Sequence, residues 1–354
     1  MTSRRTLDWQ LIIPALILLT FGLAGLGSIS LNLALTQLIF IIISSLFFYL
    51  FSRFHYQNHQ ALIKIYTFGS LIFLLLPFLF GAVTRGSVRW IQIAGLTLQP
   101  SEIIKPFLIV VLAYLLSQKK PHFPTYLLYL FLPAFLIFKQ PDLGSTLVVM
   151  AIWLGMLLVS SLPLLLPLGL ILGTLGLSPL IYKFLQPYQQ QRILSFLNPY
   201  ADPQRSGYHV IQSTIAVGSG GLLGRGLGHG TQSQLQFLPE RHTDFIFALL
   251  AEELGLIGAL ILLLTFFFLL KRLLTIAKHA PDKFSQLITI GVFTMLFFQT
   301  SVTIAMNLGL LPITGITLPL VSAGGSSLLA TLIGLGIVHN ISLNSSQKKS
   351  LVIK

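Results

Sequence analysis

Apolar runs close to 20 residues long recur from Leu11 to His339, with polar or glycine-rich segments between them. A helix of about 20 apolar residues crosses the hydrocarbon core of a bilayer, where every backbone polar group must be satisfied internally. The sequence therefore predicts an all-α integral membrane protein, a single polytopic membrane domain over residues 1–354. About ten transmembrane helices are expected, at residues 10–29, 32–52, 61–82, 101–118, 123–139, 143–160, 163–184, 242–270, 285–309 and 318–340.

The charges support this interpretation and indicate an orientation. Charged residues make up only 9% of the chain, against roughly 25% in an average soluble protein, which excludes a soluble domain. The net charge of +13 needs no nucleic-acid partner, because Lys and Arg collect in the cytoplasmic loops of membrane proteins. Both termini are predicted to be cytoplasmic, since the inner segments then carry Arg4, Arg5, Arg53, Lys64, Lys119, Lys120, Lys271, Arg272, Lys278, Lys283, Lys348, Lys349 and Lys354.

The acidic residues concentrate on the opposite side of the predicted membrane domain. Asp8 and Asp282 are expected inside, and the others map to outer loops or the outer halves of helices: Glu102, Asp142, Asp202, Glu240, Asp244, Glu252 and Glu253. Carboxylates near membrane depth are costly and mark functional sites. Two long outer loops, at about 82–100 and 185–241, lie on this side, the second between the seventh and eighth helices. The chemistry is therefore expected at the outer face.

The stretch LPERHTDFIF, residues 238–247, places several polar groups directly before an apolar run. Thr243 or Asp244 could simply cap the helix that begins there. Alternatively, Asp244 lies at the edge of an apolar wall with Arg241 and His242 behind it. Desolvation there would raise the proton affinity of the carboxylate, which suits a general base.

Two further acidic clusters could face Asp244. In PSEIIKP, Glu102 and Lys105 are three residues apart on a helix that we expect Ser101 to cap, so they can form an ion pair. In KQPDLGST, Asp142 precedes an apolar helix and could be only its cap. Glu252 and Glu253 lie deeper along their helix, where a structural ion pair and a catalytic role are both open.

Three other segments carry local signals. Residues 90–93 and 96–99 flank Ala94-Gly95 and predict a short interfacial hairpin. The glycine-rich residues 218–230 could cradle an anion such as a diphosphate, with Arg225 adding charge, or could be a flexible linker. Between residues 307 and 327, prolines and glycines break the helical pattern at membrane depth, which predicts a cavity.

Four segments in this order resemble the SEDS family (shape, elongation, division, sporulation): RWIQIAGLTLQPSEIIKP, KQPDLGST, the long run from GYHVIQS to EELGLIG, and NLGLLPITGITLPLVSAGGSS. The run GTQSQLQFLPERHTDFIFALLAEELG is more similar to the rod-shape branch of this family than to its division branch. The resemblance implies a peptidoglycan glycosyltransferase of the bacterial inner membrane that polymerises lipid II at the periplasmic face during cell-wall elongation.

The resemblance also implies residue roles and partners. The essential acid of the family falls on Asp244, and Glu102, Lys105 and Asp142 match other positions tied to activity. A ten-helix fold, a divalent cation (Mg²⁺ or Mn²⁺) and a class B penicillin-binding protein, a transpeptidase, come with it.

Our mechanistic hypothesis assigns Asp244 as the base that deprotonates the attacking sugar hydroxyl. Cations and the divalent metal would stabilise the diphosphate leaving group, and lipid tails would lie in grooves between helices. The candidate supporting residues are Glu102, Lys105, Asp142, Arg192, Arg225, Arg241 and His242. A lipid II flippase with an acidic proton relay explains the broken helices equally well, and a non-catalytic scaffold for a penicillin-binding protein is a third possibility.

Overall fold

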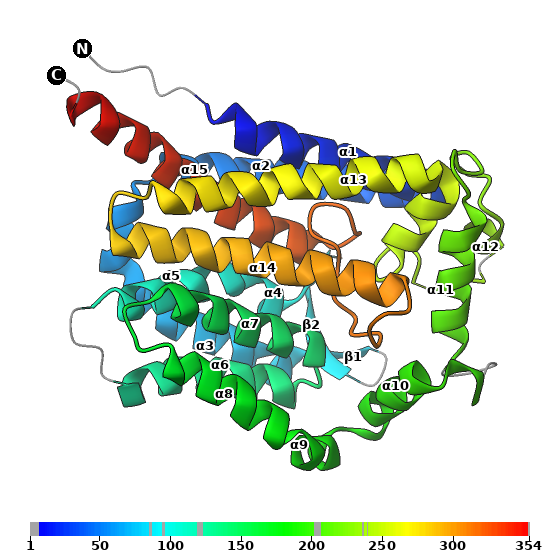
Figure 1. Ribbon diagram of the computed structural model, residues 1–354, viewed down its shortest axis with the longest axis horizontal. Coiled ribbons are helices and arrows are strands. Elements are labelled where there is room, and N and C mark those ends of the chain that lie inside the picture. Colours follow the sequence, from blue (N-terminus) through cyan, green and yellow to red (C-terminus); the bar gives the residue numbers. More distant parts are fainter. Residues whose placement is uncertain are drawn as a thin grey trace.

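The computed structural model describes residues 7–84, 87–93, 96–118, 123–201, 207–235, 237–238 and 240–352. Most of these residues are helical (Figure 1). The helices are α1 Trp9–Ile29, α2 Leu31–Arg53, η1 Tyr56–Leu62, α3 Ile63–Phe80, α4 Pro100–Ile103, α5 Lys105–Leu116, α6 Phe123–Lys139, α7 Leu143–Val159, α8 Leu165–Gly176, α9 Ser178–Phe184, α10 Pro187–Leu197, η2 Pro199–Ala201, α11 Tyr208–Ser219, α12 Thr231–Gln234, α13 Ile246–Lys278, α14 Lys283–Asn307 and α15 Gly325–Val352.

Several of these helices have the length and composition of membrane spans. Within the described residues, six are long and apolar enough to cross a bilayer, and the bent pair α8–α9 would add a seventh. Helices α5 and α7 are apolar but shorter. Each of the ten segments expected to span the membrane contains one of these helices or α6. The chain is thus a mostly helical, multi-pass membrane protein.

Two expected helices differ from the structure because proline and glycine interrupt them. Pro106 lacks a backbone N–H, and the expected helix at 101–118 is divided at Ile104 into α4 and α5. The expected helix at 318–340 begins only at Gly325, because residues 311–324 form an irregular loop that contains Pro312 and Pro319. We call residues 311–324 the central loop.

Helix α14 lies in the middle of the bundle and contacts α13, α7 and α5, while α15 packs along α2 (Figure 1). Small residues permit the close approach: a β-carbon at Gly155 would lie 2.3 Å from the Thr294 hydroxyl, and one at Gly291 would lie 2.5 Å from Ile109 Cγ2. Within membranes, helices associate largely through this kind of packing. The buried core runs continuously from α1 to α15.

One end of the bundle carries most of the irregular structure (Figure 1). There, β1 (Ala82–Thr84), β2 (Ser87–Ile93) and β3 (Leu96–Leu98) form an antiparallel sheet in the order β1-β2-β3. The β2–β3 pairing, with Ile93 opposite Leu96, confirms the expected hairpin, whose turn at Ala94-Gly95 lies outside the described residues. The strand β1 was not expected from the sequence.

The opposite end holds both chain termini (Figure 1). The Asp8 carboxylate accepts hydrogen bonds from Arg272 at 2.7 to 3.1 Å, and Tyr56 donates to Asp282 at 2.8 Å. The two acids expected on the inner side thus lie at this end. Of the basic residues expected with them, Arg4, Arg5, Lys119, Lys120 and Lys354 lie outside the described residues.

Candidate active site

Asp244 lies in the turn that precedes α13, and three consecutive backbone carbonyls hold this turn in place. Ala323 N–H donates to the His242 carbonyl at 2.8 Å, and the Ser322 hydroxyl donates to the Thr243 carbonyl at 2.7 Å. Asn307, at the end of α14, donates through Nδ2 to the Asp244 carbonyl at 2.9 Å. The side chain of Asp244 is only partly buried. The carboxylate is therefore carried by a fixed backbone and reaches an accessible surface.

The position of Asp244 contradicts the simpler interpretation of this acid as a helix cap. Helix α13 begins at Ile246, and its N-cap residue is Phe245. Neither Thr243 nor Asp244 occupies the capping position. Asn307 organises this helix start instead, because its Oδ1 accepts the N–H of Ala248 at 3.0 Å.

Arg192, on α10, reaches the same loop as Asp244. Its Nη1 donates to the Ile313 carbonyl at 3.2 Å. A β-carbon at Gly315 would lie 3.7 Å from Arg192 Nη1 and 3.7 Å from Asp244 Oδ2, so the cation and the carboxylate flank one backbone position. Gly315 has a φ of 73°, which other residues adopt only with strain. The fold thus brings together two predicted site residues that are far apart in sequence.

Asp142 is almost fully buried and is the N-cap of α7, where its Oδ1 accepts the Ser145 N–H at 3.1 Å. The capping interpretation is therefore correct but incomplete. Its Oδ2 also accepts from Gln99 Nε2 at 2.6 Å and from the Ser101 hydroxyl at 2.9 Å, and Arg89 Nη1 lies 3.6 Å from Oδ1. The expectation that Ser101 caps a helix is wrong, because Gln99 is the N-cap of α4.

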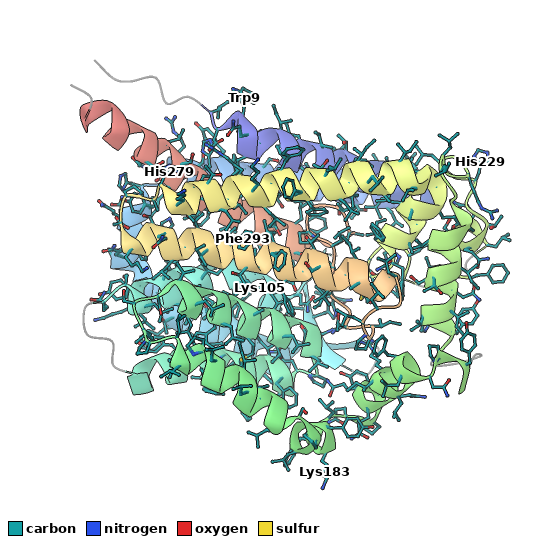
Figure 2. All side chains as sticks on the ribbon, viewed as in Figure 1. Trp9, Lys105, Lys183, His229, His279 and Phe293 are labelled. Carbon is teal, nitrogen blue, oxygen red and sulfur yellow. The ribbon has the colours of Figure 1, made fainter. Side chains whose placement is uncertain are left out.

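Glu102 and Lys105 form the ion pair that their spacing indicated, with Lys105 Nζ 2.5 Å from Glu102 Oε1. Lys105 is only 1% exposed and lies within the helix bundle, as Figure 2 shows. The Ser145 hydroxyl donates to the same Glu102 oxygen at 3.3 Å. The Ser145 N–H also donates to Asp142. Glu102, Lys105 and Asp142, three predicted site residues, therefore belong to one hydrogen-bonded network.

The central loop separates this network from Asp244 and contacts both. On one side, a β-carbon at Gly144 would lie 2.8 Å from the Thr314 carbonyl oxygen. Just beyond the loop, in the first turn of α15, the Ser326 hydroxyl accepts the Gln99 N–H at 2.9 Å. Tyr188 on α10 donates to the Pro141 carbonyl at 2.7 Å and so connects α10 to the start of α7. The broken segment thus lies between the two acidic clusters, while the cavity that the sequence predicts there stays a prediction.

Arg225 and Arg241 are placed elsewhere, beside two buried glutamates of α13. The backbone N–H of Arg225 donates to the Glu252 carbonyl at 3.0 Å, and its Nε donates to the Ser219 carbonyl at 3.2 Å. Burial lowers the pKa of Arg241, and the charge of nearby Glu253 opposes that shift. These hydrogen bonds tie Arg225 to α11 and to the second turn of α13, and the charge of Glu253 affects Arg241. His242 lies nearer Asp244, with Nε2 4.0 Å from Glu240 Oε2.

The glycine-rich residues pack against a kink in α13. Gly255 has a φ of 68°, inside a helix, and the amides of Leu256 and Ile257 donate to the carbonyls of Gly221 and Leu222. The amide of Gly226 donates to the Glu253 carbonyl at 2.9 Å. Within the segment, the amides of Gly224, Arg225 and Gly226 are thus occupied by protein carbonyls, and a backbone hydrogen bond from Gly228 reaches the Glu253 carboxylate. The segment is also too firmly bonded to be a flexible linker.

Comparison with known proteins places the chain in a family. A family model described as "Cell cycle protein", which covers FtsW, RodA and SpoVE, matches residues 11–347. The chain belongs to this SEDS family.

Among SEDS relatives, peptidoglycan glycosyltransferase MrdB from Escherichia coli K12 is 43% identical over 268 residues, 74% of this chain and 72% of MrdB. Stage V sporulation protein E from Bacillus subtilis is 38% identical over 365 residues, 97% of this chain and 99% of the relative. One solved structure is a chain of a peptidoglycan synthase complex that coordinates polymerisation and crosslinking. It matches with a TM-score of 0.82 and 34% identity, and the match covers 97% of this chain and 99% of that chain. Rod shape determining protein RodA from Thermus thermophilus matches with a TM-score of 0.73 and 28% identity, and the match covers 95% of this chain and 97% of that chain.

The hydrogen bonds of Glu252 and Glu253 indicate a structural role. Glu252 accepts from the backbone amides of Gln232 and Ser233, at 2.8 and 3.0 Å, and so holds the start of α12. Glu253 accepts from Gln234 Nε2 at 3.2 Å. Both carboxylates are buried, and both fasten the outer loop to α13. Of the two open alternatives, this geometry favours the structural one, although the partners are amides rather than an ion pair.

His209 was not identified from the sequence as a site residue of this SEDS chain, although it lies beside the candidate site. Its ring centroid is 6.4 Å from that of Phe245, the residue after Asp244. Burial lowers the pKa of His209, the charge of Arg192 lowers it further, and Glu240 opposes the shift. Its Nδ1 is buried without a hydrogen-bond partner among the described residues. A single histidine at the start of an outer helix carries no pattern that would have identified it.

Proposed function

We propose that this chain is a peptidoglycan glycosyltransferase that polymerises lipid II into glycan strands during cell-wall elongation. The names of its relatives MrdB and FtsW support glycosyl transfer. The observation that carries the residue assignment is the partly exposed Asp244 carboxylate, held by a fixed backbone turn and flanked by the Arg192 guanidinium. A base and a cation beside one another suit the attack of a hydroxyl on a sugar whose leaving group is anionic.

The proposed reaction joins two lipid-linked sugars. The 4-hydroxyl oxygen of the acceptor attacks the anomeric carbon of the donor, and Asp244 takes the hydroxyl proton. The new C–O bond forms as the bond from the anomeric carbon to the diphosphate oxygen breaks, and that electron pair leaves with the lipid diphosphate. No general acid is needed, because the diphosphate is a stable anion. The fixed turn reduces the motion that would separate the base from its substrate.

We propose that two arginines bind the diphosphate. Arg192 is exposed on α10, and Arg89, from β2, lies beside the Asp142 network. Both arginines act on Tyr188. Burial raises the pKa of Tyr188, and the charges of Arg192 and Arg89 lower it. Arg89 Nε is buried without a hydrogen-bond partner among the described residues. We therefore assign the leaving-group charge chiefly to Arg192 and Arg89, and a supporting role to the buried Glu102–Lys105 pair.

We propose that the reaction uses a divalent cation. The described residues contain no group of three or more His, Cys, Asp or Glu that could hold a metal. Mg²⁺ usually keeps several waters and binds through one or two carboxylates together with substrate phosphates. We propose that Mg²⁺ or Mn²⁺ arrives with the diphosphate and neutralises part of its charge.

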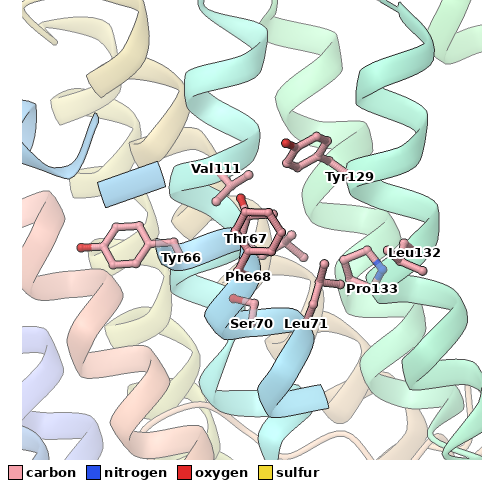
Figure 3. Close-up of a pocket in the computed structure, with 10 residues that line it drawn as sticks. Tyr66, Thr67, Phe68, Ser70, Leu71, Val111, Tyr129, Leu132 and Pro133 are labelled. Carbon is pink, nitrogen blue, oxygen red and sulfur yellow. The ribbon is translucent and has the colours of Figure 1, made fainter. Parts of the chain in front are cut away.

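An apolar cavity of about 180 Å³ between α3, α5 and α6 suits part of a lipid tail (Figure 3). Its lining includes Leu108 and Val111, which are three and six residues beyond Lys105 on α5. The cavity thus extends along the helix that begins at the Glu102–Lys105 pair. Tyr66 and Tyr129 contribute to its walls, as Figure 3 shows. We assign this cavity to a segment of one undecaprenyl chain.

The remaining proposals concern topology and partners. Ten membrane crossings in one domain follow if α4–α5, α6, α7 and α8–α9 each cross once. Both termini then face the cytoplasm of a bacterial inner membrane, and the 82–100 and 185–241 loops and the active site face the periplasm. The relative in the synthase complex supports a crosslinking partner, which we propose is a class B penicillin-binding protein.

The test is polymerisation by the purified chain, with the class B penicillin-binding protein and Mg²⁺, in detergent with lipid II. We expect glycan strands from the native chain and none from Asp244→Asn, with equal elution in gel filtration as the control for folding. Strand formation without a closed membrane separates a polymerase from a flippase. Full activity of Asp244→Asn would remove this residue from the base role. Activity that resides only in the partner would support the scaffold instead.

A further inference from the structure

A groove of about 520 Å³ lies between α1 and α13 at the end of the bundle that holds the chain termini. Ile13 and Ile17 of α1 and Phe268 of α13 form its apolar part. Trp9 and Lys271 lie at its polar end, and Figure 2 labels Trp9 at the beginning of α1. The groove is far from Asp244, because α13 begins at the active-site end and runs across the bundle. It has no part in the reaction proposed above.

Two basic residues, Lys271 and Arg272, line the groove, and they differ in whether they can bind an anion from outside. Arg272 is already neutralised by Asp8, which it contacts through Nε and Nη2 at 2.7 to 3.1 Å. The Ser342 hydroxyl also donates to this carboxylate. Lys271 is exposed, and its ammonium makes no ion pair within the described part of the chain. Lys271 therefore presents the positive charge of the groove to an outside anion.

The groove crosses the boundary between apolar and polar membrane layers. Helix α13 is apolar along residues 254–270 and becomes basic at Lys271 and Arg272. Trp9 is 56% exposed at the same level, and tryptophan side chains concentrate where hydrocarbon meets headgroups. An occupant that fits both parts has an apolar chain and an anionic head. Basic pockets between transmembrane helices bind acidic phospholipid headgroups in this way.

We propose that this groove binds one anionic phospholipid, with its phosphate beside Lys271 and an acyl chain against Ile13 and Phe268. The shape of the groove holds the chain, and Lys271 selects the charge of the head. A phospholipid there would brace α1 against α13 at the end of the molecule opposite the active site. A partner helix lying in the groove is the competing occupant.

The test is native mass spectrometry of the purified chain, titrated separately with phosphatidylglycerol and with phosphatidylcholine. We expect one tightly held phosphatidylglycerol and weaker phosphatidylcholine binding. Lys271→Gln should weaken phosphatidylglycerol about fivefold, the effect of one cation near a membrane surface, and leave phosphatidylcholine unaltered. Ile13→Trp fills the apolar part and should weaken both lipids. Lys183→Gln, at an exposed lysine outside the groove, is the matched control.

Four outcomes would overturn the proposal. Equal binding of the two lipids by the native chain would show no selection of charge. An equal loss of phosphatidylglycerol in Lys271→Gln and Lys183→Gln would indicate general attraction to a basic protein. Unaltered binding in Ile13→Trp would place the lipid elsewhere, and release of the lipid by the partner protein would assign the groove to a partner helix. Thermal unfolding in detergent confirms that each variant is folded.

Discussion

Asn307 binds the carbonyl of Asp244 through Nδ2 at 2.9 Å, and the same side chain accepts the Ala248 amide at 3.0 Å. One fully buried amide at the end of α14 thus fixes both the turn that carries the proposed base and the first turn of α13. Asn307 touches no reacting atom in the proposed reaction, so it is a positioning residue.

We expect Asn307→Ala to lower kcat by about 10²-fold with a smaller effect on KM, because displacement of a catalytic group by about 1 Å is enough for such a loss. Steady-state polymerisation of lipid II measures both constants. Ser213→Ala is the matched control, because the buried Ser213 hydroxyl donates to the Asn307 backbone carbonyl at 2.7 Å and its loss leaves the Asn307 side-chain amide in place. A similar kcat loss in both variants would indicate general destabilisation rather than positioning.

Arg192 should act on the affinity for the lipid diphosphate. Hydrogen bonds to charged groups contribute about 1.5–3 kcal/mol, so Arg192→Gln is expected to raise KM about tenfold or more. Arg192→Lys keeps the charge but loses the planar fork, and we expect an intermediate KM. Lys278→Gln, at an exposed residue of α13 at the opposite end, serves as the control. An unaltered KM in Arg192→Gln would exclude contact with the diphosphate.

The Glu102–Lys105 pair should be more sensitive to single than to double replacement. Lys105 is buried, so Glu102→Gln leaves its charge without a partner, which costs about 3–5 kcal/mol in comparable buried pairs. Glu102→Gln combined with Lys105→Met removes both charges, and we expect it to be more stable than either single variant. Thermal unfolding in detergent with a double-mutant cycle measures the coupling. Additive losses would show that the two charges act independently.

The kink at Gly255 should tolerate no side chain. A β-carbon there would lie 2.2 Å from the Gly224 amide nitrogen, and its φ of 68° disfavours any other residue. We expect Gly255→Ala to separate the glycine-rich residues from α13 and to increase their cleavage by protease. Gly218→Ala is the control, because no atom lies within 4 Å of its β-carbon position and alanine favours the α11 helix. Equal protease resistance in the two variants would contradict the packing.

His209 should make the active-site end less stable in acid. Its pKa is lowered in the folded protein, so the unfolded chain binds a proton first as the pH falls through about 6.5. Stability is therefore lost below that pH, and the loss levels off below the folded pKa. We expect His209→Gln to lose less thermal stability than the native chain between pH 7.5 and 5.5. Identical pH profiles would show that His209 does not contribute.

Local features of the sequence predicted much of this structure. Apolar runs of bilayer length located the helices, and a spacing of three residues identified the Glu102–Lys105 pair, because both depend only on neighbours along the chain. The approach of Arg192 to Asp244 could not be predicted in this way. It depends on the central loop, whose Gly315 lies between two groups that are distant in sequence.

The misassigned residues show the same limit. Ser101 has the character of a helix cap, yet it donates to Asp142, which is distant in sequence and better suited as an acceptor. The glycine-rich residues suggested either a cradle or a linker, and only the carbonyls exposed by the α13 kink explain their role. In each case a tertiary partner replaced the local one. Sequence patterns identify which groups are present, but packing decides what they bond.

The kink at Gly255 also imposes an order on biogenesis. The glycine-rich residues precede α13 in the chain, so the amides of Arg225 and Gly226 lack their carbonyl partners until the start of α13 has been synthesised. The two bonds to the carbonyls of Glu252 and Glu253 can therefore form only after those residues have been added to the chain. A chain truncated before α13 would lack these carbonyls, so its glycine-rich residues could not form the contacts that the full chain makes.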